Sequence, residues 1–215
     1  IFSQRPVTLS YEFFPAKNDR AWKTFTDTVD ELSPLAPDFT SVTYGAGGST
    51  REGTLEAIRI VQEQGGMHAT AHYTCVGASV ATIDEQLNSF AAAGIDNILA
   101  LRGDPPKNNP DWQPEPGGFA HAVDLVKHIK ADGRFDIVCA AFPEKHPQAP
   151  TRESDWGHLM TKFEAGATAA ITQMFYDVRA YEEMMTWLEQ RMGQRPRHIP
   201  ARMPASVALA ALCMT

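Results

Sequence analysis

Short apolar runs alternate along the chain with amphipathic stretches, and this alternation predicts strands separated by helices. Several of the runs are almost continuous in apolar residues, as in Ile98–Leu101 and Ile137–Ala141. Such runs are typical of strands that are covered on both faces, which favours a parallel sheet. The predicted strands are Val7–Phe14, Phe39–Tyr44, His68–Cys75, Asn97–Arg102, Asp136–Phe142, Ala169–Phe175 and His198–Arg202.

The stretches between these runs repeat their apolar positions with the period of a helix. Ile83, Leu87 and Phe90 fall on one helical face, and Gly94 follows where a left-handed cap residue belongs. The strands start about every 30 residues, which is the length of one βα unit. We therefore predict an α/β fold, a (β/α)8 TIM barrel, as a single domain over residues 1–215. At least one strand and its helix are missing from this count, so we expect the barrel to be incomplete at its C-terminal end.

Composition and charge exclude several classes of partner. Of the 215 residues, 43% are hydrophobic and 21% are charged, which is ordinary for a globular protein. The net charge of −7 argues against nucleic acid or an anionic membrane as a partner. The first residues lack the pattern of a secretory signal and an initiator Met, so we expect the sequence to begin inside a longer gene product. The three widely spaced cysteines are predicted to be reduced thiols of a cytoplasmic protein.

Polar residues recur at the C-terminal ends of the predicted strands, where barrels of this class carry their active sites. Glu12 lies in the first strand among aromatic residues, which predicts partial desolvation, a raised pKa and general-acid duty. A surface carboxylate at a strand end is the alternative interpretation. Arg102-Gly103-Asp104 follows an apolar strand, and its glycine permits close approach to a ligand. A salt bridge within an ordinary turn explains that motif equally well.

Two other patterns give weaker predictions. The glycine-rich segment 45–50 departs from a dinucleotide fingerprint, because Thr50 stands at the third glycine position and the acidic residue expected later is missing. A loop that contacts a phosphate or a ring stays possible there. Glu144, His146 and His158 could cluster, but their spacing matches no metal motif, and no metal site is predicted.

Six short motifs together resemble the methylenetetrahydrofolate reductase family, in order and at family-like spacing. They cover the chain from Val7 to Asp177. Each motif is weak alone, whereas the series is specific. The motifs are Tyr11-Glu12-Phe13-Phe14-Pro15, Ser41-Val42-Thr43-Tyr44-Gly45-Ala46, His72-Tyr73-Thr74-Cys75, Ala100-Leu101-Arg102-Gly103-Asp104, Phe142-Pro143-Glu144-x-His146-Pro147 and Ile171-Thr172-Gln173.

The resemblance implies a barrel that holds FAD non-covalently and reduces 5,10-methylenetetrahydrofolate to 5-methyltetrahydrofolate. NADH or NADPH would reduce the flavin, leave, and be replaced by the folate in a ping-pong order. Glu12 matches the family's general acid, which protonates the folate amine so that the ring opens to an iminium ion. Asp104 matches the carboxylate that stabilises this cation beside the flavin and the folate. Gln173 matches the residue that orients the folate and the nicotinamide.

The resemblance also implies a set of cofactor contacts, and three positions depart from the family pattern. Phe142 and His121 stand where many members have Tyr, and Thr161 stands where some carry a basic residue. The predicted contacts with the flavin or the nicotinamide are Thr43, Tyr44, Ala46, His72, Arg102, Gly103, Asp104, Ala122, Phe142, His146, Ala149, Asp155, His158 and Lys162.

Three functional hypotheses remain open from the sequence. The first is the flavin-dependent folate reductase, and the second is a flavin-binding remnant or subunit without independent reductase activity. The third is an unrelated barrel lyase or aldolase, which needs a Schiff-base Lys or a metal cluster on a strand. No predicted strand contains Lys, which disfavours the third. An incomplete barrel would expose sheet edges, so we expect a homo-oligomer.

Overall fold

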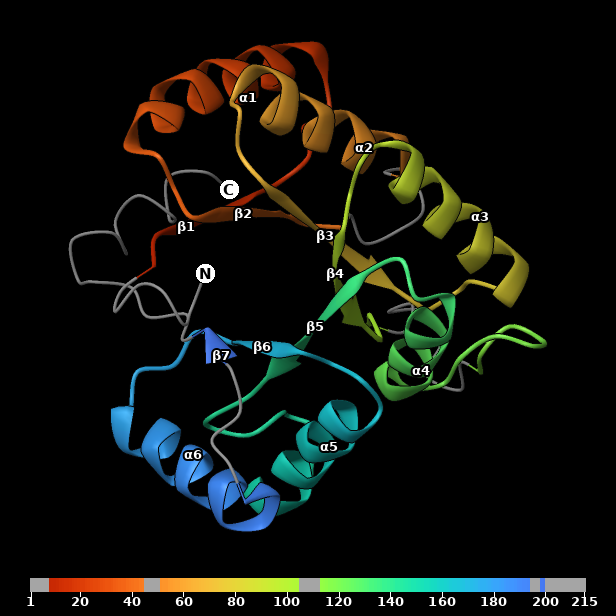
Figure 1. Cartoon of the computed structure of the whole chain (residues 1–215), viewed down its shortest axis with the longest axis vertical. Helices are drawn as coiled ribbons and strands as arrows, with labels where there is room; N and C mark the ends of the chain where they lie inside the picture. The colour runs from red at the N-terminus through yellow and green to blue at the C-terminus, as the bar shows by residue number, and fades with distance from the viewer. Residues whose placement is uncertain (1–7, 45–50, 105–112, 194–197, 200–215) are drawn as a thin grey trace. The chain divides into compact units, whose positions relative to one another are not determined.

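The computed structural model describes residues 8–44, 51–104, 113–193 and 198–199 (Figure 1). It is an α/β fold in which parallel strands alternate with helices. The chain divides into two compact units, Ile1–Ile137 and Val138–Thr215. The single domain predicted over residues 1–215 stays a prediction.

The first unit contains a parallel sheet whose strands pair in the order of the chain. In the register, Glu12 on the first strand lies beside Ser41 on the second, and Ser41 lies beside Thr70 on the third. A short 3-10 turn, Ser33–Leu35, and a π-helical turn, Ile60–Gln64, follow the first two helices. The elements are β1 Ser10–Phe13, α1 Asp19–Leu32, β2 Phe39–Val42, α2 Arg51–Arg59, β3 Ala69–Thr74, α3 Val80–Ala92, β4 Asn97–Leu101 and α4 Ala122–Asp132, before β5 Asp136–Ala141 begins.

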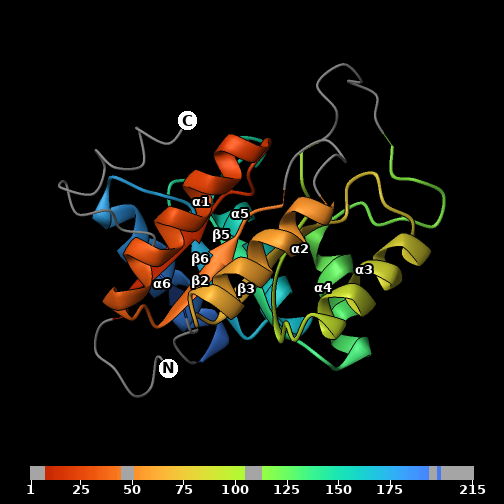
Figure 2. The ribbon, with the colours of Figure 1, turned by 90° about the horizontal axis from the view of Figure 1, so that it is seen from above.

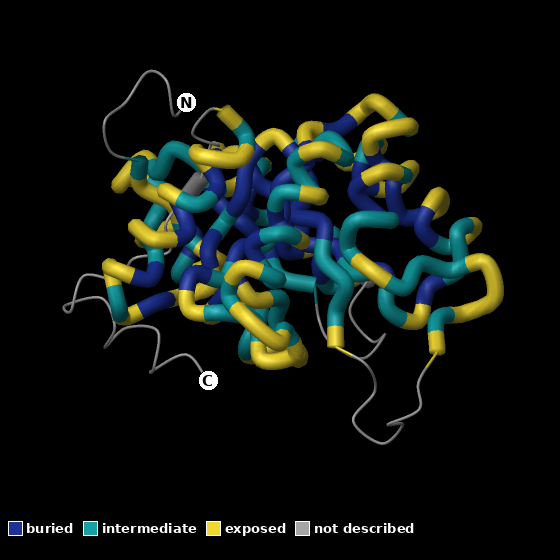
Figure 3. The backbone as a smooth tube through the Cα atoms, turned by 90° about the horizontal axis from the view of Figure 1, so that it is seen from below, coloured by how far each residue is buried: buried dark blue, intermediate teal, exposed yellow. Residues whose placement is uncertain are grey.

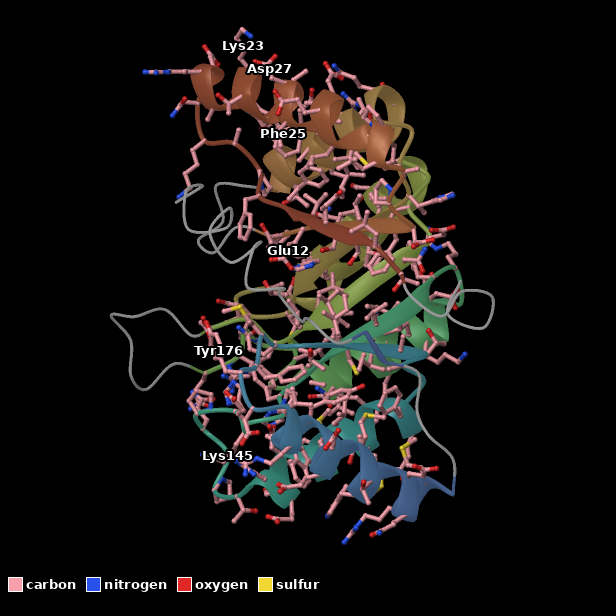
Figure 4. The ribbon with its side chains drawn as sticks, turned by 90° about the vertical axis from the view of Figure 1, so that its left-hand side faces the viewer. Glu12, Lys23, Phe25, Asp27, Lys145 and Tyr176 are labelled. Carbon is pink, nitrogen blue, oxygen red and sulfur yellow. The ribbon has the colours of Figure 1, made fainter. Side chains whose placement is uncertain are left out.

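Successive side chains of a strand point to opposite faces of the sheet. On one face Phe13 contacts Phe25 of α1, with ring centroids 5.6 Å apart, and Tyr73 contacts Phe90 of α3 at 5.8 Å. The helices α1, α2 and α3 lie side by side over this face (Figure 2). Glu12 therefore lies on the opposite face of β1 from Phe25, as Figure 4 shows. The opposite face of the sheet, which these helices do not cover, carries polar side chains such as Glu12.

The helix boundaries follow capping chemistry that the sequence contains. The side chain of Asn18 accepts a hydrogen bond from the backbone nitrogen of Ala21, and Ser79 caps α3 in the same way through Thr82. After α3 the chain turns through Gly94 at a φ of 71°, which confirms the predicted left-handed cap. Buried residues lie mainly along the strands and on the helix faces that cover them (Figure 3).

The second unit repeats the same strand and helix order. It contains β5, α5 Arg152–Glu164, β6 Ala169–Thr172, α6 Val178–Met192 and β7 His198–Ile199. These strands are parallel, and Ala141 of β5 lies beside Thr172 of β6. The rings of Trp156 on α5 and Trp187 on α6 meet at 5.9 Å, so Trp156 packs one helix against the next.

All seven predicted strands are present in the described part of the chain, and six of them are shorter than predicted at one or both ends. The trimmed residues include both polar and apolar side chains, so the apolar pattern did not mark the strand ends. The last predicted strand, His198–Arg202, extends beyond the described residues. Its described part is β7, which contains two residues. Within the described ranges, no helix combines the length and the apolar character that a membrane crossing requires.

Candidate active site

The polar face of the first sheet is built by neighbouring positions on β1, β2 and β3. Glu12, Ser41 and Thr70 share this face because the parallel register places them side by side. His72 lies on the same face, two residues further along β3. Ser41, Thr70 and His72 are at most 7% exposed. Burying polar side chains costs free energy unless they find hydrogen-bond partners, so this face is a candidate functional surface.

Glu12 is the carboxylate of this face. Its side chain is 48% exposed, and the burial of the remainder raises the pKa of the carboxyl above its usual value. The direction of this shift and its cause, partial desolvation, are those predicted from the sequence. Among the neighbouring aromatic residues, Phe13 points to the helices on the other face, and Phe14 is 66% exposed.

His72 is the buried partner of Glu12. Burial lowers the pKa of His72 to about 4, so the imidazole is neutral at neutral pH. Its Nε2 atom lies 3.9 Å from a carboxylate oxygen of Glu12, and because the ring is neutral this contact is no ion pair. Within the described residues, this Nε2 has no hydrogen-bond partner. A buried polar atom without a partner is costly, and it marks a place where a ligand could supply the missing hydrogen bond.

The depressed pKa of His72 predicts a specific loss of stability in acid. The unfolded ring binds a proton below pH 6.5, whereas the folded ring stays neutral down to about pH 4. The contribution of neutral His72 to the free energy of unfolding is therefore complete above pH 6.5 and declines as the pH falls through this window. The expected total loss is about 3 kcal/mol.

Comparing urea unfolding of the wild type and His72→Gln between pH 7 and pH 4 isolates this effect. The stability difference between the two proteins should change by about 3 kcal/mol across the range, because only the wild type loses this contribution. His68→Gln is the matched control, since His68 lies just before β3 with an exposed side chain. A difference that stays constant with pH would contradict the burial of a neutral ring.

The turn after β4 holds Gly103 against the turn after β3. Gly103 has a φ of 83°, and a Cβ atom there would lie 2.6 Å from Cγ1 of Val76 and 2.9 Å from Cβ of Thr74. The carbonyl of Arg102 accepts hydrogen bonds from the nitrogen of Val76 at 2.8 Å and the thiol of Cys75 at 3.6 Å. Burial raises the pKa of Cys75 to about 11, which keeps this thiol protonated as a donor. Gly103 thus permits its turn to pack closely against Thr74 and Val76, while the predicted close approach to a ligand stays a prediction.

The other predicted contacts of the first unit lie at the ends of β2 and β4 and at the start of α4. Tyr44 packs edge-to-face on Tyr73 at 5.4 Å, and the backbone of Thr43 donates to Phe13 at 2.9 Å. Asp104 follows Gly103 as an exposed residue. Ala122 is the first residue of α4. Ala46 lies outside the described residues.

In the second unit the loop after β5 gathers several predicted flavin contacts. The rings of Phe142 and His146 meet edge-to-face at 4.8 Å. The backbone nitrogen of His146 donates to a carboxylate oxygen of Asp155 at 2.9 Å, which ties the loop to α5. The ammonium of Lys162 donates to the carbonyl of Ala140 at 2.6 Å, so this cation lies near the end of β5. The structure thus brings these four residues together around one strand end.

The remaining predicted residues of the second unit lie at its surface. Ala149 is half-buried in the loop after β5, whereas His158 on α5 is exposed. Gln173 directly follows β6 with an exposed side chain, and its backbone nitrogen donates to the carbonyl of Ala141 at 2.7 Å. Tyr176, three residues later, is 82% exposed. The roles predicted for these residues stay predictions.

Two residues of the loop after β5 have structural roles that sequence reasoning missed. Glu144 accepts hydrogen bonds from the backbone nitrogens of Tyr176 and Asp177 instead of joining histidines. Lys145 adopts a φ of 99°, which is uncommon for a residue with a side chain. In the described ranges, no three His, Cys, Asp or Glu side chains are grouped to hold a metal ion. Cys75 and Cys139 are buried free thiols, as predicted, while Cys213 lies outside these ranges.

Comparisons with known proteins agree with the motif series. The family model described as methylenetetrahydrofolate reductase matches residues 1–213. A 5,10-methylenetetrahydrofolate reductase of Pectobacterium carotovorum subsp. carotovorum is 40% identical over 180 residues, covering 83% of this chain and 58% of the relative. Methylenetetrahydrofolate reductase (NADH) 1 of Arabidopsis thaliana is 33% identical over 100% of this chain and 39% of the relative. The chain therefore spans 58% of the length of the bacterial relative.

One solved structure with a similar fold is an uncharacterized protein from Clostridium thermocellum that binds two copies of 5-methyl-5,6,7,8-tetrahydrofolic acid. Its TM-score is 0.64 at 11% identity, covering 100% of this chain and 78% of that chain. At this identity the similarity concerns the fold alone. The family match extends over nearly the whole chain and includes the strand ends that carry Glu12, Gly103 and Gln173. The chain belongs to the methylenetetrahydrofolate reductase family.

Proposed function

We propose that the protein catalyses the FAD-dependent reduction of 5,10-methylenetetrahydrofolate to 5-methyltetrahydrofolate, with NADH or NADPH as reductant in ping-pong order. The observation that carries this proposal is the half-buried carboxyl of Glu12, whose pKa is raised, beside the buried neutral ring of His72. Membership of the family supplies the reaction class. The proposal includes a (β/α)8 barrel, which is supported by the parallel βα units of both halves of the chain.

The residues present in each unit fit a flavin. In the first unit, His72 offers a buried ring nitrogen without a partner among the described residues, to which a flavin could hydrogen-bond. In the second unit, Lys162 brings a positive charge to the end of β5, which suits an anionic phosphate. Bound FAD would supply the two-electron chemistry that carries hydride from the nicotinamide to the folate.

Glu12 would act as the proton donor to the folate. A carboxyl whose pKa is raised keeps its proton closer to neutral pH and donates it more readily to an amine. Because His72 is neutral, it does not stabilise the carboxylate form of Glu12 as a cation would. Asp104 would stabilise the cation that forms on the folate, and Gln173 would orient the ring. Both side chains are exposed at strand ends, where they can reach a ligand.

Titration of the purified full-length protein with FAD tests the cofactor part of this proposal. The protein should be yellow as isolated or after reconstitution, and anaerobic NADH or NADPH should bleach the bound flavin. A barrel aldolase or lyase would stay colourless. Protein that neither contains FAD nor takes it up on reconstitution would contradict the proposed function.

A further inference from the structure

The loops after β5 and β6 are joined by one carboxylate oxygen. Glu144 Oε1 accepts hydrogen bonds from the backbone nitrogen of Tyr176 at 3.1 Å and from that of Asp177 at 3.0 Å. A third bond, from the nitrogen of Gln173 to the carbonyl of Ala141, holds the start of the second loop at 2.7 Å. The segment Gln173–Asp177 is therefore fixed at both ends to the strand and loop beside it.

Glu144 lies at the start of α6, where a carboxylate is favoured. Tyr176 and Asp177 directly precede α6, and the side chain of Asp177 caps that helix by accepting from the nitrogen of Arg179 at 3.0 Å. The backbone N–H groups at a helix start are donors without partners inside the helix, and the helix dipole favours negative charge there. Glu144 thus binds the start of α6 from the neighbouring loop.

The loop that carries Glu144 is itself held in one conformation. The ammonium of Lys145 donates to the carbonyl of Ala149 at 2.6 Å and to that of His146 at 3.3 Å. Lys145 has a φ of 99°, a conformation that persists only where surrounding contacts impose it. Figure 4 shows Lys145 and Tyr176 on loops at the same side of the second unit. Because this loop is held in one conformation, its hydrogen bonds to the loop after β6 can hold Gln173 in a fixed position.

We infer that Glu144 is a positioning residue, which fixes the Gln173–Asp177 segment so that Gln173 presents its amide to the substrate. This inference rests on the proposed function, because Gln173 is the proposed substrate contact. One carboxylate oxygen of Glu144 accepts hydrogen bonds from two backbone nitrogens. Glu144 therefore affects the substrate through the position of Gln173. It also ties the segment that carries Gln173 to the loop that carries His146, a proposed flavin contact.

A double-mutant cycle in the full-length protein tests whether Glu144 acts through Gln173. The readout is the rate at which methylenetetrahydrofolate reoxidises the reduced flavin. Glu144→Ala should slow this step about tenfold in the wild-type background, because small displacements of a positioning group cost rate steeply. In a Gln173→Ala background the same substitution should have less than about a twofold effect, since its target is gone. Equal effects in both backgrounds would overturn the inference.

Amide hydrogen exchange separates this inference from the proposed function. Removing the acceptor should speed exchange at Tyr176 and Asp177 about tenfold in Glu144→Ala, with an intermediate effect in Glu144→Gln, which keeps one acceptor oxygen. Glu182→Ala, an exposed carboxylate on α6, is the matched control and should leave both amides unchanged. Unchanged exchange in Glu144→Ala would overturn the inference alone. A wild type that does not reduce folate would overturn both proposals, whatever the exchange shows.

Discussion

Gly103→Ala is expected to lower the free energy of unfolding by about 3 kcal/mol. The backbone φ of 83° at this position costs a residue with a side chain roughly 1–2 kcal/mol. The added methyl group would also lie 2.6 Å from Val76 Cγ1 and 2.9 Å from Thr74 Cβ, and such overpacking costs about 1–3 kcal/mol. Urea unfolding monitored by circular dichroism measures the change.

Gly77→Ala separates the two contributions. Gly77 has a φ of 68°, but a Cβ atom there would meet nothing within 4 Å. The control variant should therefore lose only the backbone contribution of roughly 1–2 kcal/mol. If Gly103→Ala were no more destabilising than Gly77→Ala, the close packing of the turn after β4 on the turn after β3 would be contradicted.

Glu12→Gln should separate the two proposed half-reactions. The amide has the shape of the carboxyl but donates no proton of comparable acidity, so folate reduction should slow about 10²–10⁴-fold. Flavin reduction by NADH or NADPH should change by less than about twofold, because hydride transfer to the flavin needs no acid at this position. Stopped-flow absorbance of the flavin measures both steps.

The same variant tests whether Glu12 is only structural. Because the pKa of Glu12 is raised, its ionised form opposes folding above the ordinary pKa, and a neutral amide should not lower stability at pH 7. Glu31→Gln on α1 is the matched control, since Glu31 is an exposed carboxylate of the same unit. Equal loss of both half-reactions in Glu12→Gln, with a loss of stability, would show a structural role.

The strands were predictable because short segments, nearly continuous in apolar residues in β4 and β5, alternate with helical stretches. The meeting of Glu12 and His72 was not predictable, because it depends on the register of three strands that are about 30 residues apart in sequence. The alternation of side chains along β1, and not the register, turns Phe13 away from the carboxyl of Glu12.

The loop after β5 shows the limit of reasoning from motifs. Its Pro143-Glu144-x-His146-Pro147 motif indicated Glu144 and His146 as candidate site residues. The hydrogen bonds that Glu144 accepts from the backbone nitrogens of Tyr176 and Asp177 join residues more than 30 positions apart, and no local pattern encodes them. The positive φ of Lys145 could not be predicted from the sequence either, because lysine, unlike glycine, is not a residue that indicates a turn.

The central claim is that this protein reduces methylenetetrahydrofolate through a bound flavin, with Glu12 as the acid. The most direct measurement is anaerobic: the full-length protein is reconstituted with FAD, bleached with NADH or NADPH, freed of nucleotide, and mixed with 5,10-methylenetetrahydrofolate. We predict that the flavin absorbance returns with formation of 5-methyltetrahydrofolate, at a rate that falls as the pH rises through the raised pKa of Glu12. A flavin that binds and bleaches but is never reoxidised by the folate would contradict the claim, and would identify a flavin-binding protein without reductase activity.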